Sequence, residues 1–466
     1  MSNSDAWFPD HVANWYDACE ESDFLVESSD WAQATPPTVH NWTIEFAKDP
    51  NAFAYKLSEK IARLPESEER IKYCYFALRA ASDVLAYVRF RLASSLSCNP
   101  AWREIWNQWL NTGRLNRNTQ GLLVPSVDRR YYCQGSSRDL RIHQVASHFP
   151  GFQRWKGDQG IKVEIKVLPL LQADLRTRLD EGECLRCALV PLPNAMTDLR
   201  YESIGDVGSL SAFSVSLAHP SRTCHEAVKL LREAIARGAD IVVFPELCMT
   251  TEGQSRLQEA LRKLTTRRPF LVLGGTALTP EGRNEAVVLD GRGNVLFRQH
   301  KLFPYVMSAS ETERYGIEGD LYLTARRERI TTTPRVLRIL DTPLGRIGVL
   351  ICEDLSVSRV FGPIAESLAL DLLLVPVMDG AQRDERWTAD RALYYARECS
   401  TAVVVATTRA LVRRHIASER KRRGGEPFRA ADEIGLYVPG GHACKVSPVL
   451  CGARSGFSIF EIKPPE

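Results

Sequence analysis

The stretch Ile347-Gly-Val-Leu-Ile-Cys-Glu-Asp354 carries most of the information about the fold of this chain. Its apolar first half predicts a buried β-strand. The strand ends in a thiol, Cys352, which two carboxylates follow at once. In α/β proteins, reactive side chains gather at the carboxyl edge of the sheet, so this thiol is a candidate nucleophile. A cysteine beside apolar residues is more often a small core side chain, so the stretch needs support from elsewhere.

Two further segments supply that support. Asp240-Ile-Val-Val-Phe-Pro-Glu246 is another apolar strand that ends in a carboxylate, and Arg298-Gln-His-Lys-Leu-Phe-Pro304 places Lys301 after a third strand. Roughly 50 residues separate each of these ends from the next, so the three side chains can meet only through the fold. Taken singly, each is more often structural: a solvated Glu or Lys, or a core Cys. Together they offer a base, a cation and a nucleophile.

In these three motifs the chain resembles the nitrilase, or carbon–nitrogen hydrolase, superfamily. The resemblance covers roughly the C-terminal 280 residues. It implies that the catalytic triad of the superfamily corresponds to Glu246 in Phe-Pro-Glu, Lys301 in His-Lys-Leu and Cys352 in Ile-Cys-Glu-Asp. It implies an α-β-β-α sandwich that pairs into homodimers or higher homo-oligomers. It also implies hydrolysis of a non-peptide carbon–nitrogen bond through a cysteine thioester.

The chemistry of the three side chains agrees with that expectation. A free thiol is mostly protonated at neutral pH, so a nucleophilic cysteine needs a neighbouring base or cation. Glu246 can take the thiol proton and pass it to the departing nitrogen. Lys301 and the backbone N–H of Glu353 can stabilise the negative oxygen of a tetrahedral intermediate.

Many superfamily members carry a second glutamate after the lysine. The segment Ser310-Glu-Thr-Glu-Arg-Tyr-Gly-Ile-Glu-Gly-Asp320 matches that region, and its register falls between Glu311 and Glu313. Glu311 is preferred, and the resemblance implies that it orients Lys301 or the substrate.

The chain also departs from its relatives. True nitrilases usually follow the cysteine with Trp-Glu, whereas Glu353-Asp354 stands here, which favours amide or carbamoyl substrates over nitriles. Cys-Glu-Asp is also similar to the glutaminase domain of glutamine-dependent NAD synthetases. Those enzymes need an ATP-pyrophosphatase partner with a Ser-Gly-Gly-x-Asp-Ser loop, and this sequence contains none.

Composition sets wider bounds. The 466 residues are 44% hydrophobic and 25% charged with a formal net charge of +3, which predicts two domains and favours no particular partner. The N-terminus lacks the pattern of a secretory signal, no apolar run approaches a membrane span, and twelve scattered cysteines are typical of reduced thiols, so we expect a cytoplasmic protein without membrane contact. Cys184 and Cys187 have no second pair at zinc-finger spacing. We therefore expect no metal and no cofactor.

Three regions are expected along the chain. Residues 1–150 predict a mostly helical N-terminal domain of unknown function, with helical periodicity over 53–63 and 71–95. Eight of the nine tryptophans gather at this end, in an aromatic core or on a partner surface; the core is favoured. They are Trp7, Trp15, Trp31, Trp42, Trp102, Trp106, Trp109 and Trp155. Residues 151–185 are expected to form a connecting region with a half-exposed strand over 161–168. Residues 186–466 are expected to form the hydrolase domain.

Within the hydrolase domain the sequence predicts alternating strands and helices. Ser221 is the expected N-cap of a helix that Gly238 closes. Gly291-Arg-Gly293 predicts a hairpin between strands 285–290 and 294–298. Gly440-Gly-His442 is expected in a closing strand. The basic segment 413–423 is expected to be a solvated loop, and an anion-binding surface is the alternative.

A function of another class remains open. The chain could be an effector or accessory component of a larger assembly, because nitrilase-like domains also occur fused to bacterial antiviral reverse transcriptases. The basic segment 413–423 or the tryptophan-rich N-terminal domain would then bind nucleic acid or a protein partner. The chain has no Tyr-x-Asp-Asp polymerase motif, so that activity would belong to a partner.

Overall fold

The computed structural model describes residues 7–20, 37–65, 68–92, 100–117, 121–125, 152–155, 157, 160–169, 173–207, 210–265, 267–315, 325–422, 432–441, 444–452 and 456–462. The chain divides into two compact units. One comprises Met1–Asp128, Gly135–Gly160 and Pro363–Ala369, and the other comprises Arg129–Gln134, Ile161–Gly362 and Leu370–Glu466. Among the described residues, no helix combines the length and the apolar character needed to cross a bilayer.

The N-terminal unit is mostly helical, as predicted. Several of its helices begin at a proline, whose fixed φ suits the first helical turn and whose missing N–H costs nothing there. Asp49 caps one of them by accepting a hydrogen bond from the N–H of Ala52 at 3.1 Å. The elements are α1 (Phe8–Glu20), α3 (Pro37–Lys48), α4 (Pro50–Ala62), α5 (Glu68–Leu92), α6 (Pro100–Thr112) and the antiparallel pair β1 (Leu122–Pro125) and β2 (Phe152–Trp155).

The tryptophans of this unit form an aromatic core, which confirms the favoured interpretation. Phe8 is fully buried and packs against Phe46 and Trp102, with ring centroids 5.1 and 5.4 Å apart. Trp31 lies outside the described residues, and Trp42 is half-buried. The buried tryptophans are Trp7, Trp15, Trp102, Trp106, Trp109 and Trp155.

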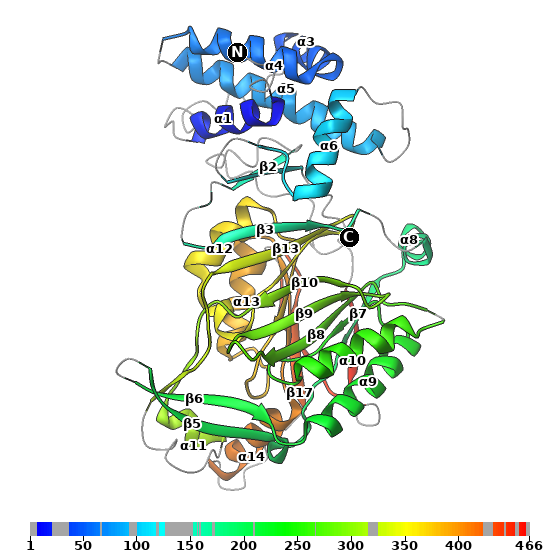
Figure 1. Cartoon of the computed structure of the whole chain (residues 1–466), viewed down its shortest axis with the longest axis vertical. Coiled ribbons are helices and arrows are strands. Elements are labelled where there is room, and N and C mark those ends of the chain that lie inside the picture. The colour runs from blue at the N-terminus through cyan, green and yellow to red at the C-terminus, as the bar shows by residue number, and fades with distance from the viewer. Residues whose placement is uncertain are drawn as a thin grey trace. The chain divides into compact units, whose positions relative to one another are not determined.

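The second unit contains a six-stranded sheet in the order β10-β9-β8-β7-β4-β19. Helices α9 (Pro220–Ala236) and α10 (Thr251–Arg262) cover one face, as Figure 1 shows, and their apolar stripes pack into one buried cluster with the strands. The strands are β4 (Leu185–Leu189), β7 (Ile241–Val243), β8 (Leu271–Leu278), β9 (Asn284–Asp290), β10 (Val295–His300) and β19 (Ser458–Ile462). The predicted hairpin is the antiparallel pair β9–β10.

A seven-stranded sheet has the order β18-β17-β16-β15-β14-β13-β3, with α13 (Trp387–Glu398) packed against β16 and β17. The expected strand over 161–168 is β3, which pairs in parallel with β13 at the edge of this sheet. The strands are β3 (Lys162–Val167), β13 (Val336–Thr342), β14 (Gly345–Val349), β15 (Leu372–Pro376), β16 (Ala402–Ala406), β17 (Glu433–Val438) and β18 (Ser447–Leu450).

The two sheets pack face to face, which gives the expected α-β-β-α sandwich. They approach closely at Gly435 on β17: a Cβ there would lie 2.3 Å from Cδ1 of Leu189 on β4 and 2.2 Å from the carbonyl oxygen of Val405 on β16. Only glycine fits between the layers at this point.

A third, four-stranded sheet lies at one end of the sandwich in the order β11-β12-β6-β5 (Figure 1). Its strands are β5 (Leu199–Val207), β6 (Leu210–Leu217), β11 (Val306–Met307) and β12 (Arg326–Glu328). Helices α11 (Ala309–Tyr315) and α14 (Arg409–Arg422) contact each other at the same end. This end carries much of the wall of the candidate site.

Three local predictions were wrong or incomplete. Helix α9 begins at Pro220 with His219 as N-cap, so Ser221 lies inside the first turn, because proline is well suited to the first helical position. The basic segment 413–423 is helical as far as Arg422 and is not a loop: it belongs to helix α14, whose apolar face is buried. Arg423 lies outside the described residues. Gly440 forms only an isolated bridge, and His442 is not described.

Candidate active site

The fold brings the three sequence-predicted residues to one cavity. Glu246 lies just beyond β7, Lys301 follows β10 directly, and Cys352 begins the short 3-10 helix η5 (Cys352–Ser356) after β14. All three are buried and line a cavity of about 60 Å³. The carboxyl ends of strands from both sheets therefore converge on one point, as the sequence predicted.

Lys301 is held between two carboxylates. Its Nζ donates to Oε1 of Glu246 at 2.8 Å and to Oε2 of Glu328 at 2.7 Å. Burial alone would lower the pKa of Lys301, but the negative charges of Glu246 and Glu328 outweigh it, and the pKa lies well above its ordinary value. Lys301 is therefore a buried ammonium ion that two carboxylates hold in place.

The thiol of Cys352 is a neighbour of Glu246. Burial raises the pKa of this thiol well above its ordinary value, the charge of Glu246 raises it further, and Lys301 opposes both effects. Burial also raises the pKa of Glu246, against the charge of Lys301 and a hydrogen bond with Cys352. The resting pair is thus a protonated thiol beside a carboxylate whose proton affinity is increased, which is the arrangement that proton transfer requires.

Glu328 is a residue that the sequence prediction missed. It comes from β12, which pairs in parallel with β6, and its Oε2 also accepts the backbone N–H of Tyr305 at 3.1 Å. Asn284, at the start of β9, donates to Oε1 of Glu246 at 2.9 Å and to Oε1 of Glu328 at 3.3 Å. These two residues complete the surroundings of Lys301. No signal in Arg326-Arg-Glu-Arg329 distinguishes this glutamate from a solvated one.

Glu311 lines the same cavity from helix α11. Its hydrogen bonds come from the hydroxyl of Tyr305 at 2.5 Å and from the N–H and hydroxyl of Ser308 at 2.8 and 2.7 Å. The alternative, Glu313, is exposed on the same helix. In the structure the carboxylate that contacts Lys301 besides Glu246 is Glu328, so orientation of Lys301 by Glu311 stays a prediction.

The expected oxyanion residue, Glu353, is half-buried in η5, where its side chain accepts a hydrogen bond from the hydroxyl of Ser356 at 2.6 Å.

Cys352 and Leu247, the residue after Glu246, both have φ of +48°. Residues other than glycine rarely adopt this left-handed backbone conformation, and the strain that it causes is common at functional sites.

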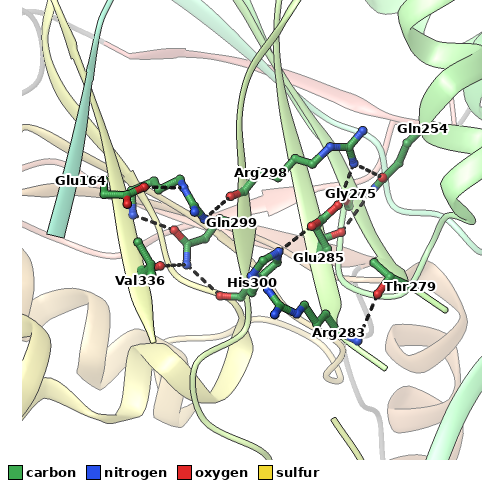
Figure 2. A network of polar contacts seen from close by, with 11 residues as sticks. Glu164, Gln254, Gly275, Thr279, Arg283, Glu285, Arg298, Gln299, His300 and Val336 are labelled. Atoms are coloured by element: carbon green, nitrogen blue, oxygen red, sulfur yellow. Dashed lines mark hydrogen bonds and ion pairs between the residues drawn. The ribbon is translucent and has the colours of Figure 1, made fainter. Parts of the chain in front are cut away.

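A polar network between the two sheets supports the strand that carries Lys301 (Figure 2). Arg338 on β13 donates through its side chain to the carbonyl oxygen of Arg298 at 2.9 Å, and the side chain of Gln299 donates to the carbonyl oxygen of Val336 at 3.0 Å. His300 contacts Glu285 at 2.6 Å, which ties β10 to β9. The strand is thus fixed on both sides immediately before the lysine.

Apolar side chains form most of the remaining cavity wall. They come from the four-stranded sheet, from α14 and from the segments after β7 and β15: Tyr201, Phe213, Val215, Leu247, Met307, Met378 and Leu411, with the side chains of Tyr305, Asp379 and Trp387 completing the lining. Burial and the charge of Glu246 raise the pKa of Tyr201, so its hydroxyl keeps its proton.

Part of the chain matches a known protein family. Residues 215–369 match the carbon-nitrogen hydrolase family, and that range contains Glu246, Lys301, Glu328 and Cys352. Over these residues the chain is similar to the carbon-nitrogen hydrolases of the nitrilase superfamily. No curated protein matches the chain.

The likeness to solved structures is remote. An amidase from Nesterenkonia sp. is 15% identical with a TM-score of 0.39, and the alignment covers 61% of this chain and 92% of that one. Nit3 of Saccharomyces cerevisiae, a member of branch 10 of the nitrilase superfamily, is 14% identical with a TM-score of 0.38, over 60% of this chain and 90% of that one. The similarity to the superfamily therefore depends on the match over residues 215–369 and not on these likenesses.

Proposed function

We propose that this protein hydrolyses a non-peptide carbon–nitrogen bond, of an amide or carbamoyl group, with Cys352 as nucleophile and Glu246 as general base and acid. The observation that carries the proposal is the buried contact set in which Lys301 lies 2.8 Å from Glu246 while Glu246 also neighbours the thiol of Cys352. A base, a cation and a nucleophile line the same cavity, whose volume is about 60 Å³.

The first half of the reaction forms the thioester. Glu246 takes the proton of Cys352 as Sγ attacks the carbonyl carbon, and the carbonyl oxygen becomes an oxyanion that Lys301 stabilises. The protonated Glu246 then gives its proton to the nitrogen, which leaves as ammonia or an amine when the carbon–nitrogen bond breaks. The raised pKa of Glu246 suits it to hold the proton between these two steps.

The second half releases the acid. Glu246 deprotonates a water molecule, the hydroxide attacks the thioester carbon, and the thiolate leaves and regains the proton from Glu246. Lys301 stabilises the second oxyanion as it did the first. Glu328 and Asn284 keep Lys301 and Glu246 in place throughout, as positioning residues.

The test is Cys352→Ala with intact-mass spectrometry. The wild-type protein, incubated with a series of short amides, should release ammonia and show a covalent acyl adduct on Cys352 when quenched in acid. Cys352→Ala should lose turnover and adduct while its circular dichroism spectrum is unchanged. Full turnover in that variant would refute the mechanism.

A further inference from the structure

We propose that the amide accepted by this site carries a positively charged group at the far end of a short acyl chain, and that Glu311 binds that group. The inference rests on the proposed function and assigns its substrate class.

Negative charge predominates in the described lining of the cavity. Four carboxylates line the cavity, from Glu246, Glu311, Glu328 and Asp379, against one cation, Lys301. Lys301 is already shared by Glu246 and Glu328. A substrate carboxylate would therefore meet excess negative charge in this part of the chain.

Among the residues that the structure describes, Glu311 is the carboxylate of this lining that contacts no cation. Asp379 forms an ion pair with Arg386 and accepts a hydrogen bond from Nε1 of Trp387 at 3.0 Å. Among the described residues, the partners of Glu311 are neutral: the hydroxyl of Tyr305 and the N–H and hydroxyl of Ser308. These donors fix the carboxylate in position without neutralising its charge.

The wall around Glu311 is largely apolar. Apolar groups such as Phe213, Met307 and Leu411 lower the local dielectric, so the attraction of Glu311 for a cation is stronger here than at an exposed surface. The cavity of about 60 Å³ admits only a few non-hydrogen atoms beyond the reacting amide. A short aliphatic chain ending in an ammonium group satisfies both the apolar wall and Glu311.

The experiment compares three amides of similar size. Ammonia release is measured for butyramide, which is neutral, 4-aminobutyramide, which is cationic, and succinamate, which is anionic. We expect kcat/KM for 4-aminobutyramide to exceed that for butyramide by about tenfold or more, with succinamate the slowest, because one unbalanced charge in a partly buried site has an effect of this size.

Glu311→Gln keeps the shape of the side chain and removes its charge. In this variant the ratio of 4-aminobutyramide to butyramide should fall to near one, while the matched variant Glu313→Gln, two residues along the same helix and exposed, should keep the wild-type ratio. Faster turnover of succinamate or butyramide by the wild-type protein, or an unchanged ratio in a folded Glu311→Gln variant, would overturn the inference.

Failure of the proposed function has a different signature. None of the three amides would then release ammonia or leave an adduct on Cys352. Calorimetric titration of the Cys352→Ala variant with the same amides decides the substrate class in that case. Preferential binding of 4-aminobutyramide supports the inference, and equal binding of the three, or preference for succinamate, refutes it.

Discussion

Asp354 accepts a hydrogen bond from the backbone N–H of Leu302 at 3.0 Å and thereby joins the segment after the nucleophile to the segment after the lysine. The same carboxylate accepts the N–H of Phe303 at 2.9 Å and of Ile351 at 3.2 Å. Asp354 is fully buried; burial raises its pKa to about 8, against the charge of Lys301 and these backbone donors. One side chain therefore sets the spacing between Lys301 and Cys352.

Asp354→Asn should damage both stability and turnover. The new NH2 group would face backbone donors, which leaves buried N–H groups unpaired, at a cost of about 2–4 kcal/mol in the free energy of unfolding. Turnover should fall by about 10²-fold because a small displacement of the lysine from the nucleophile is enough to do so. Urea denaturation and ammonia release measure the two effects. The exposed Asp384→Asn is the control, and equal behaviour of the two variants would contradict the assigned role.

Glu328→Gln should lower kcat by about 10²–10³-fold, in the range reported for loss of one electrostatic group in an active site. Glu328 raises the pKa of Lys301, so its removal should also move the alkaline fall of activity to lower pH. The pH profile of kcat measures this shift, which mere loosening of the fold would not produce. Glu281→Gln on the exposed loop serves as control. An unmoved alkaline limb would show that Glu328 does not act through the lysine.

The acid limb of the profile should report Glu246. The reaction needs this carboxylate ionised, and burial raises its pKa above the ordinary 4.5. As pH falls, kcat/KM should therefore decrease with a midpoint above 4.5. Circular dichroism at the same pH values separates this loss from acid unfolding. A rate that stays constant down to pH 4.5 in folded protein would exclude Glu246 as the base.

Gly435→Ala should be strongly destabilising, by about 3 kcal/mol or more, because the added methyl would overlap the carbonyl oxygen of Val405 and the side chain of Leu189. Gly205→Ala is the comparison: its φ is +74° and nothing lies within 4 Å of the added atom, so only about 1 kcal/mol of backbone strain is expected. Thermal unfolding of the two variants measures the difference. Similar losses would mean that the sheets can separate at Gly435.

The sequence predicted the three strand ends because each motif combines an apolar strand with a reactive residue, and chain direction alone brings such ends to one edge of a sheet. It also predicted the β9–β10 hairpin from the glycines of Gly291-Arg-Gly293. Both are local sequence patterns, and the position of these residues in the fold follows from the pattern directly.

Glu328 could not be predicted in the same way. Its segment, Arg326-Arg-Glu-Arg329, is too charged to resemble a strand that borders a buried site. Its place depends on pairing with β6, more than 100 residues earlier, where Arg326 faces Ser211. Helix α14 was missed because its dense charge hides the small buried apolar face to which Leu411, Val412 and Ile416 contribute.

Cys352 and Leu247 have a left-handed backbone conformation that is strained for residues with a side chain, so folding alone would not favour either residue at its position. Glycine would adopt this conformation without the strain at both positions. We therefore expect the present residues to be retained only where selection for catalysis outweighs the stability that glycine would add. Descendants of this protein that abandon turnover should drift toward glycine or asparagine there. Such a change, met in a related genome, would identify a pseudoenzyme before any assay.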